Sequence, residues 1–115
     1  MTVNPRRACR KDNNHDVIAD AFRRHGWDWY ETYQFAQYLP GFPDGMAVRN
    51  GMVVLVEIKN GDATLTPDEE RFIANYHAPV IIARSVEDVE RLEHIALSWP
   101  GNAAQTSLRK DKNMS

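Results

Sequence analysis

The dipeptide Asn50-Gly51 constrains the fold of this chain more than any other feature of the sequence. It lies between two strand-like runs, residues 45–49 and 52–59. Asparagine followed by glycine favours a type I′ turn, because both central residues of that turn need positive φ angles. A two-residue turn also sets the register of the hairpin, so that Arg49 faces Met52 and each further pair follows in step. The sequence therefore predicts an antiparallel hairpin with a defined register.

The same register places Asp44 directly opposite Glu57 at the open end of the hairpin. Facing residues have Cβ atoms about 4.5–5.5 Å apart, and like charges in such a pair are destabilising. Side chains alternate along a strand, so Lys59 falls on the same face as Glu57. Two carboxylates and one amine are thus predicted to converge. A bound divalent cation is the simplest explanation for this costly arrangement.

Apolar periodicity and turn residues predict the other elements of the chain. In order they are a helix at residues 13–25, a strand at 27–33, the hairpin, a helix capped at Thr66, a strand at 79–83 and a helix at 86–97. The residues expected to face the core are Val17, Ile18, Ala21 and Phe22 in the first helix, Phe72, Ile73 and Tyr76 in the second, and Val89, Leu92 and Leu97 in the third. We therefore expect a single-domain α/β fold, with one mixed sheet and helices on both faces.

Two helix starts carry specific capping signals. Thr66, Pro67 and Glu69 form the pattern of a capping box with proline at the first helical position. Asp12 or Asn13 is the expected N-cap of the first helix. The last strand, at residues 79–83, is expected to pair in parallel with its neighbour, because a helix lies between them.

The chain has 115 residues, which suffices for one domain with one core. We expect a basic arm at residues 1–11, the folded domain at 12–98 and a polar tail at 99–115. No apolar run approaches the roughly 20 residues needed to cross a bilayer, and none follows the basic N-terminus as in a signal peptide. A single cysteine, Cys9, excludes an internal disulfide and fits the cytoplasm of a bacterium or a phage-infected cell.

The formal net charge of −2 argues against a generally basic, nucleic-acid-binding surface. Any basic footprint must be local, and the arm and the C-terminal stretch 109–112 are the places for it. Solvated ends with no binding role remain the alternative interpretation of both. If DNA binds, the residues expected to line its groove are Arg6, Arg7, Arg10, Lys11 and Arg49.

Four short motifs in this order resemble a known family. They are Asn14-His15, Gly41-Phe42-Pro43-Asp44, Glu57-Ile58-Lys59-Asn60-Gly61 and Leu65-Thr66-Pro67-Asp68-Glu69. The pattern is similar to the PD-(D/E)XK nuclease superfamily, and within it to the stand-alone VRR-NUC-type nucleases of phages and bacteria. The resemblance spans about residues 12–92 and implies a restriction-endonuclease-like core.

The resemblance also implies roles for individual residues. Asp44 and Glu57 would bind Mg²⁺ or Mn²⁺ together with the backbone carbonyl of Ile58, an all-oxygen set that suits hard cations. Lys59 would orient the attacking water or offset charge that develops on the phosphate. His15 stands where the family usually has glutamine or glutamate, so its catalytic role is an acid–base one or a hydrogen bond to a metal-bound water. Glu69 stands where the family tends to have glutamine, and capping explains it.

Structural interpretations of the same residues stay open. Asp44 also suits a turn, Glu57 and Lys59 suit the charged end of an exposed strand, and His15 suits a packed position at the edge of the core. The aromatic residues Trp27, Trp29 and Tyr30 are expected in the core and on the sheet surface rather than as base-stacking platforms.

Two functions from different classes follow. The first is a metal-dependent endonuclease acting on DNA as a homodimer, with the selectivity for branched DNA that the resemblance to Holliday-junction resolvases implies. The second is a catalytically inactive nucleic-acid-binding or assembly module that has kept the fold.

Overall fold

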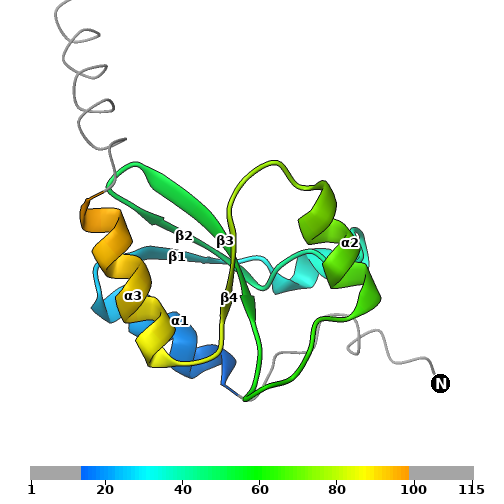
Figure 1. Ribbon diagram of the computed structural model, residues 1–115, viewed down its shortest axis with the longest axis horizontal. Helices are drawn as coiled ribbons and strands as arrows, with labels where there is room; N and C mark the ends of the chain where they lie inside the picture. The colour runs from blue at the N-terminus through cyan, green and yellow to red at the C-terminus, as the bar shows by residue number, and fades with distance from the viewer. Residues whose placement is uncertain (1–13, 99–115) are drawn as a thin grey trace, which may run out of the picture.

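The computed structural model of this protein describes residues 14–98 (Figure 1). The arm and tail predicted at residues 1–11 and 99–115 lie outside the described residues. The elements are α1 (His15–Arg24), β1 (Asp28–Glu31), the 3₁₀ helix η2 (Tyr33–Gln37), β2 (Gly45–Arg49), β3 (Met52–Ile58), α2 (Pro67–Asn75), β4 (Val80–Ala83) and α3 (Val86–Leu97). This order confirms the predicted α/β class, and only η2 was not predicted.

The four strands form one mixed sheet in the order β1-β2-β3-β4. The first three strands pair antiparallel, whereas β4 runs parallel to β3, as predicted from the helix between them. The turn residues Asn50 and Gly51 have φ angles of 54° and 79°, as a type I′ turn requires. The hairpin register runs from Arg49 opposite Met52 to Gly45 opposite Val56. Local turn chemistry therefore determined the pairing of β2 and β3.

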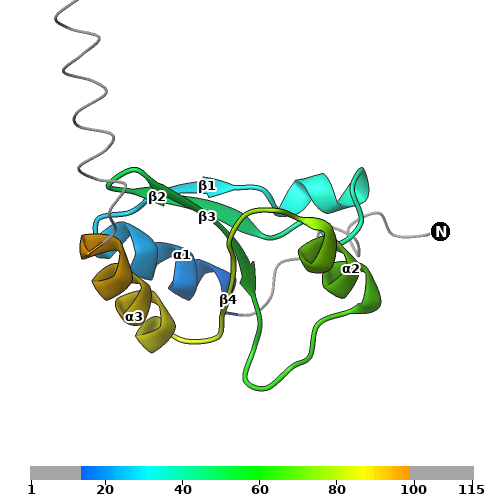
Figure 2. The same ribbon diagram turned by 45° about the horizontal axis from the view of Figure 1, so that its top comes forward.

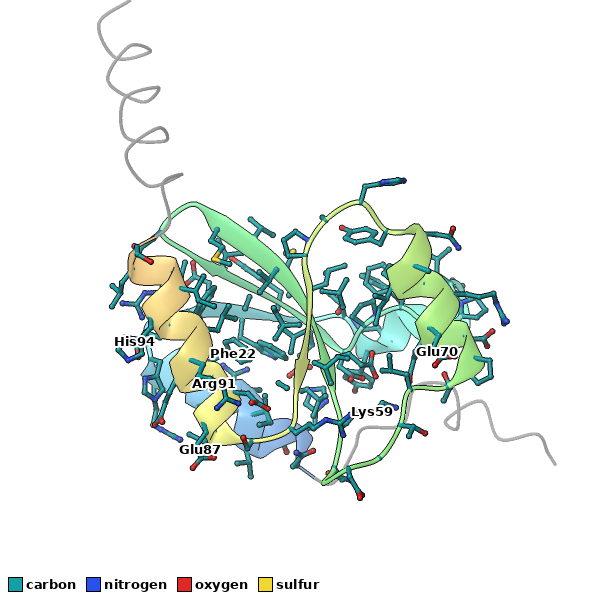
Figure 3. All side chains as sticks on the ribbon, in the orientation of Figure 1. Phe22, Lys59, Glu70, Glu87, Arg91 and His94 are labelled. Atoms are coloured by element: carbon teal, nitrogen blue, oxygen red, sulfur yellow. The ribbon has the colours of Figure 1, made fainter. Side chains whose placement is uncertain are left out.

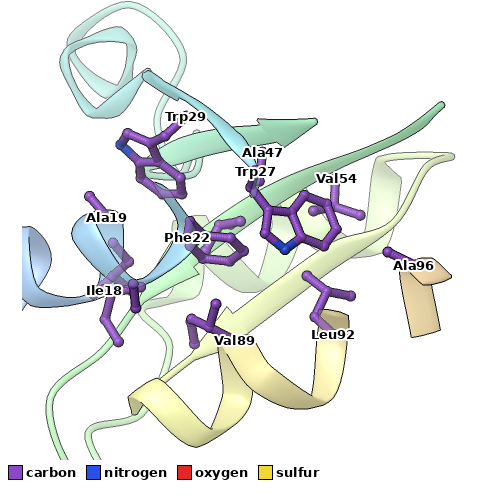
Figure 4. Close-up of a cluster of buried hydrophobic side chains, with 14 of the residues drawn as sticks. Ile18, Ala19, Phe22, Trp27, Trp29, Ala47, Val54, Val89, Leu92 and Ala96 are labelled. Atoms are coloured by element: carbon purple, nitrogen blue, oxygen red, sulfur yellow. The ribbon is translucent and has the colours of Figure 1, made fainter. Parts of the chain in front are cut away.

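Helices α1 and α3 lie side by side on one face of the sheet (Figures 1 and 2). They enclose the main core with the inward side chains of β1, β2 and β3, and the ring of Phe22 stacks on Trp29 at a centroid distance of 5.1 Å. Figure 4 shows this cluster, whose labelled members are Ile18, Ala19, Phe22, Trp27, Trp29, Ala47, Val54, Val89, Leu92 and Ala96. No helix among residues 14–98 combines the length and apolar character that a membrane span requires.

In α1 and α3, two residues predicted to face the core are exposed instead. Val17 in α1 is 54% exposed and Leu97 in α3 is 57% exposed. Successive residues of a helix are rotated by about 100°, and both residues lie beside the line of side chains that contacts the sheet rather than on it. Ala19 and Ala96, which are fully enclosed, occupy that stripe. Their small side chains allow the two helices to approach the strands closely.

Helix α2 is less enclosed than its sequence pattern predicts. None of its residues is buried, and Tyr76, predicted to face inward, is 41% exposed at its C-cap. The helix packs against the segment after β1 through aromatic rings. The ring centroid of Phe42 lies 5.1 Å from that of Phe72 and 5.6 Å from that of Phe35. In Figures 1 and 2 it lies apart from α1 and α3.

The capping box of α2 is present as predicted. The Thr66 hydroxyl accepts from the backbone N–H of Glu69 at 3.2 Å, and the Glu69 carboxylate accepts from the N–H of Thr66 at 2.8 Å. The N-cap of α1 was predicted wrongly: it is Asn14, whose side chain makes no capping hydrogen bond. The amide of Asn14 instead donates to the carbonyl of Lys59 at 3.0 Å. A long-range contact has replaced the local cap.

Gly45 lies directly under the indole ring of Trp29, and a Cβ atom added there would overlap that ring. Trp29 is 9% exposed and stacks on Phe22, so it has little room to move. We expect Gly45→Ala to lower the free energy of unfolding by about 1–3 kcal/mol. Urea denaturation measures the loss. In a Trp29→Phe background the cost of Gly45→Ala should shrink, and an equal cost in both backgrounds would locate the strain elsewhere.

Candidate functional site

Three of the residues predicted to form the site, Asp44, Glu57 and Lys59, gather where β3 ends. Asp44 immediately precedes β2, Glu57 is the penultimate residue of β3, and Lys59 follows the strand. Figure 3 shows Lys59 at this end of the sheet, on the side toward α2. Neighbouring Val56 and Ile58 point into the core under α1 and α3. Alternation along the strand therefore sends the side chains of Glu57 and Lys59 to the opposite face.

The position of Asp44 differs in detail from the sequence prediction. The paired register ends at Gly45 and Val56, so Asp44 does not continue the ladder opposite Glu57. Its N–H donates to the carbonyl of Val56 at 2.9 Å, and its carboxylate accepts from the N–H of Ile58 at 2.7 Å. The carboxylate binds the backbone of β3 directly, which a register argument on Cβ positions does not foresee.

Glu57 is a buried acid surrounded by other acids. Only 3% of the surface of Glu57 is exposed. Burial, the negative charge of Asp44 and a hydrogen bond with Glu69 raise the pKa of Glu57 to about 10 from 4.5, and the nearby charge of Lys59 offsets this only in part. Glu57 therefore carries a proton at neutral pH. The Asp44 carboxylate acts on it electrostatically, as expected if both acids reach the same side of the sheet.

Lys59 is the basic member of the cluster, and it is 8% exposed. Its Nζ lies 2.7 Å from Oε1 of Glu69 and 3.9 Å from Oε2 of Glu57. The predicted approach of Lys59 to Glu57 is thus present. The shorter contact, however, is with the acid on α2.

Glu69 is a member of the site that sequence reasoning assigned only to capping. Burial opposes its ionisation, but hydrogen bonds from Lys59, the Thr66 backbone and Glu57 together lower the pKa of Glu69. It is the ionised partner of the lysine. The resemblance includes this position, where the nucleases that the sequence resembles tend to have glutamine, but the capping pattern by itself accounts for a glutamate there.

His15 lies in a different environment. It is 1% exposed, and its Nε2 is 2.7 Å from Oε1 of Glu31. Glu31 pairs with Gly45, which pairs with Val56, so these three residues point to the same face of the sheet. The side chain of Glu31 therefore lies on the face of α1 and α3, opposite to that of Glu57. The buried Nδ1 of His15 has no hydrogen-bond partner. These contacts suit a packed histidine, and its catalytic role stays a prediction.

The predicted DNA-binding residues are not brought together by the described part of the chain. Arg6, Arg7, Arg10 and Lys11 lie outside residues 14–98. Arg49 is at the turn end of the hairpin, away from Asp44. Its guanidinium donates to the carbonyl of His25 and lies 3.2 Å from Oε2 of Glu93. A hydrogen bond from His25 is the main cause that lowers the pKa of Glu93.

The aromatic residues of β1 are placed as predicted. Trp27 and Trp29 are 3% and 9% exposed and belong to the core, whereas Tyr30 is half exposed on the sheet surface. The two tryptophans are therefore not available for stacking on nucleic-acid bases.

The donor set at the end of β3 suits a magnesium-type cation. Within residues 14–98 there is no group of three or more His, Cys, Asp or Glu side chains arranged as a ready-made metal site. Mg²⁺, however, usually binds through one or two carboxylates, with water and substrate phosphate completing its shell. Asp44 and Glu57 supply two such carboxyl groups. A cation there would offset both the cost of burying a charged Glu57 and the repulsion from Asp44, which together keep Glu57 protonated.

No family model, curated protein or solved structure matches this chain at a significant level.

Proposed function

We propose that this chain is a divalent-metal-dependent nuclease that hydrolyses phosphodiester bonds in DNA. The observation that carries the proposal is the cluster at the end of β3, where Lys59 lies 3.9 Å from Glu57 and the charge of Asp44 acts on the same carboxyl group. The types of these residues, their order in the chain and their placement on a hairpin followed by β3 agree with the resemblance to PD-(D/E)XK nucleases.

A purely structural role explains this cluster poorly. Burying ionisable groups costs free energy, and well-packed apolar residues of similar size are often as stabilising or more so. Glu57 is 3% exposed, and it keeps its proton because burial and the charge of Asp44 disfavour a second negative charge there. Strongly shifted acids with a specific charged partner are typical of functional sites.

The residues of the site have distinct roles in this proposal. Asp44 and Glu57 would hold Mg²⁺ or Mn²⁺ with the carbonyl of Ile58, and Glu57 would release its proton when they do so. The bound cation would supply a Lewis acid for the phosphate and a more acidic water. Lys59 offsets negative charge on the phosphate, a task for which its compact ammonium is suited.

The substrate and assembly follow from the resemblance. Cutting both strands of a branched DNA requires two sites. Residues 14–98 hold one such cluster, so a homodimer would provide the pair. The site lies on the sheet face that α1 and α3 do not cover, and this face also exposes Tyr30 and Val53, each about half accessible. Sedimentation of the protein with and without a four-way DNA junction measures the assembly.

Incubation of the purified protein with supercoiled plasmid and with a four-way junction tests the function. Cleavage in Mg²⁺ or Mn²⁺ that stops in EDTA is the expected result. Binding without cleavage in either metal would contradict the nuclease and favour the inactive nucleic-acid-binding module. A protein that neither binds nor cleaves these DNAs would contradict the nuclease and the nucleic-acid-binding module alike.

A further inference from the structure

A single carboxylate joins the start of α2 to the lysine of the site. Glu69 accepts from the N–H of Thr66 at 2.8 Å, which closes the capping box, and its Oε1 also lies 2.7 Å from the ammonium of Lys59. One side chain thereby connects a local helix signal with a residue on the sheet. The two contacts have different chemical requirements.

We propose that Glu69 is a positioning residue that holds the Lys59 ammonium in place beside Glu57 and makes its placement depend on α2. The effect of Glu69 on catalysis rests on the proposed nuclease function. Its effect on the position of the Lys59 ammonium rests only on the contacts between the two side chains.

Capping alone does not require an acid at this position. Glutamine closes a capping box as well as glutamate does, because the cap needs only an acceptor oxygen. The lysine does need a negative charge, since it is 8% exposed and a buried ammonium without an ionised partner is costly. Glu57 lies farther from Nζ of Lys59, at 3.9 Å against 2.7 Å for Glu69, so Glu69 is the direct partner of the ammonium. The charge of Glu69 is therefore explained by Lys59 rather than by the helix.

Because α2 is weakly enclosed, loss of the Glu69–Lys59 contact would affect the position of the helix. None of the residues of α2 is buried, and its described contacts to the rest of the fold include the Phe42–Phe72 ring pair and the Glu69–Lys59 ion pair. A helix without a buried residue changes position more readily when one of its contacts is lost. Lys59 would then lose its orientation as well.

The variant Glu69→Gln separates the two functions of the side chain. It keeps an acceptor for the cap and removes the charge that faces Lys59. Glu70→Gln is the matched control, because it removes the same charge one residue further along an exposed part of the same helix turn. Both are made in the full chain. Thermal unfolding should show that Glu69→Gln remains folded.

The first readout does not depend on catalysis. Lys59 is the only lysine among residues 14–98, and a Lys59→Arg variant assigns its ammonium signal in ¹H–¹⁵N correlation spectra. We expect this signal to shift or to broaden beyond detection in Glu69→Gln and to stay unchanged in Glu70→Gln. An unchanged Lys59 signal in Glu69→Gln would overturn the inference.

The second readout is the cleavage rate. In Glu69→Gln we expect kcat to fall about 10- to 100-fold with little change in KM, as for a misplaced catalytic group. A kcat equal to that of the wild type would overturn the positioning role in catalysis. If the wild type itself cuts no DNA, the proposed function fails, and the ammonium signal still decides whether Glu69 positions Lys59.

Discussion

Replacing Asp44 with asparagine is expected to reduce metal-dependent cleavage of DNA by more than about 100-fold while leaving the fold intact. Asp44 supplies one of the two carboxylates proposed to hold the cation. Its side chain also accepts from the N–H of Ile58 at 2.7 Å, and the amide oxygen of asparagine is able to make the same hydrogen bond. The substitution therefore removes the charge and keeps the shape. Plasmid nicking in Mg²⁺ and Mn²⁺ measures the rate.

Asp62→Asn is the matched control for this variant. Asp62 is an exposed residue in the turn after β3, so the same chemical change there removes the same net charge close to the site in sequence. Its cleavage rate should equal that of the wild type. An Asp44→Asn protein that folds and cuts at the wild-type rate would rule out Asp44 as a metal ligand, and the nuclease assignment would lose its main support.

The stability of the metal-free protein is expected to fall as the pH rises through the neutral range. The pKa of Glu57 is about 10 in the folded protein and near 4.5 in the absence of its surroundings. Between these values the folded state holds a proton that the unfolded chain has released. This group therefore contributes a decrease of up to about 1.4 kcal/mol per pH unit in the free energy of unfolding over that window.

Glu57→Gln should remove that slope. Glutamine resembles the protonated acid and is able to donate a hydrogen bond to Glu69 as the acid does. In EDTA at pH 8 we expect this variant to be more stable than the wild type, and at pH 4 the two should be similar. Urea denaturation at several pH values gives both curves. Parallel curves for the two proteins would mean that Glu57 is ionised in the folded state.

Added metal should reverse the loss of stability in the wild type. Millimolar Mn²⁺ or Mg²⁺ is expected to raise Tm, because a ligand that binds only the folded state stabilises it by mass action. The increase should be larger at pH 8 than at pH 6, since binding displaces the proton of Glu57. It should be absent in Glu57→Gln. An equal increase in both proteins would indicate that the metal binds elsewhere.

Short-range chemistry determined the parts of this fold that the sequence predicted well. The turn at Asn50-Gly51 depends on the φ preferences of two adjacent residues, and the capping box of α2 depends on side chains three positions apart. The parallel pairing of β3 and β4 follows from the helix signal that lies between them. Each of these features is decided within a short stretch of chain, so a sequence pattern is sufficient to specify it.

The orientation of the helices needed the assembled core. The pattern in α1 allowed Val17 to face inward, yet Ala19 is enclosed and Val17 is 54% exposed. An apolar stripe leaves the helix free to rotate by about one residue, or 100°, until it meets its partner. Packing against β1 and α3 decides the rotation. The sequence of α1 does not contain the shape of that partner surface.

In the candidate site, too, some features follow from local sequence and others from the assembled fold. The sequence by itself determined that Asp44, Glu57 and Lys59 come to one end of a hairpin, because a tight turn and a two-residue period carry that information. Only the tertiary structure decided that the carboxylate of Asp44 binds the backbone of β3 and that Glu69 pairs with Lys59. These contacts depend on where strand pairing ends and where a separate helix comes to rest. Both are set by the balance of packing, desolvation and charge over the whole domain.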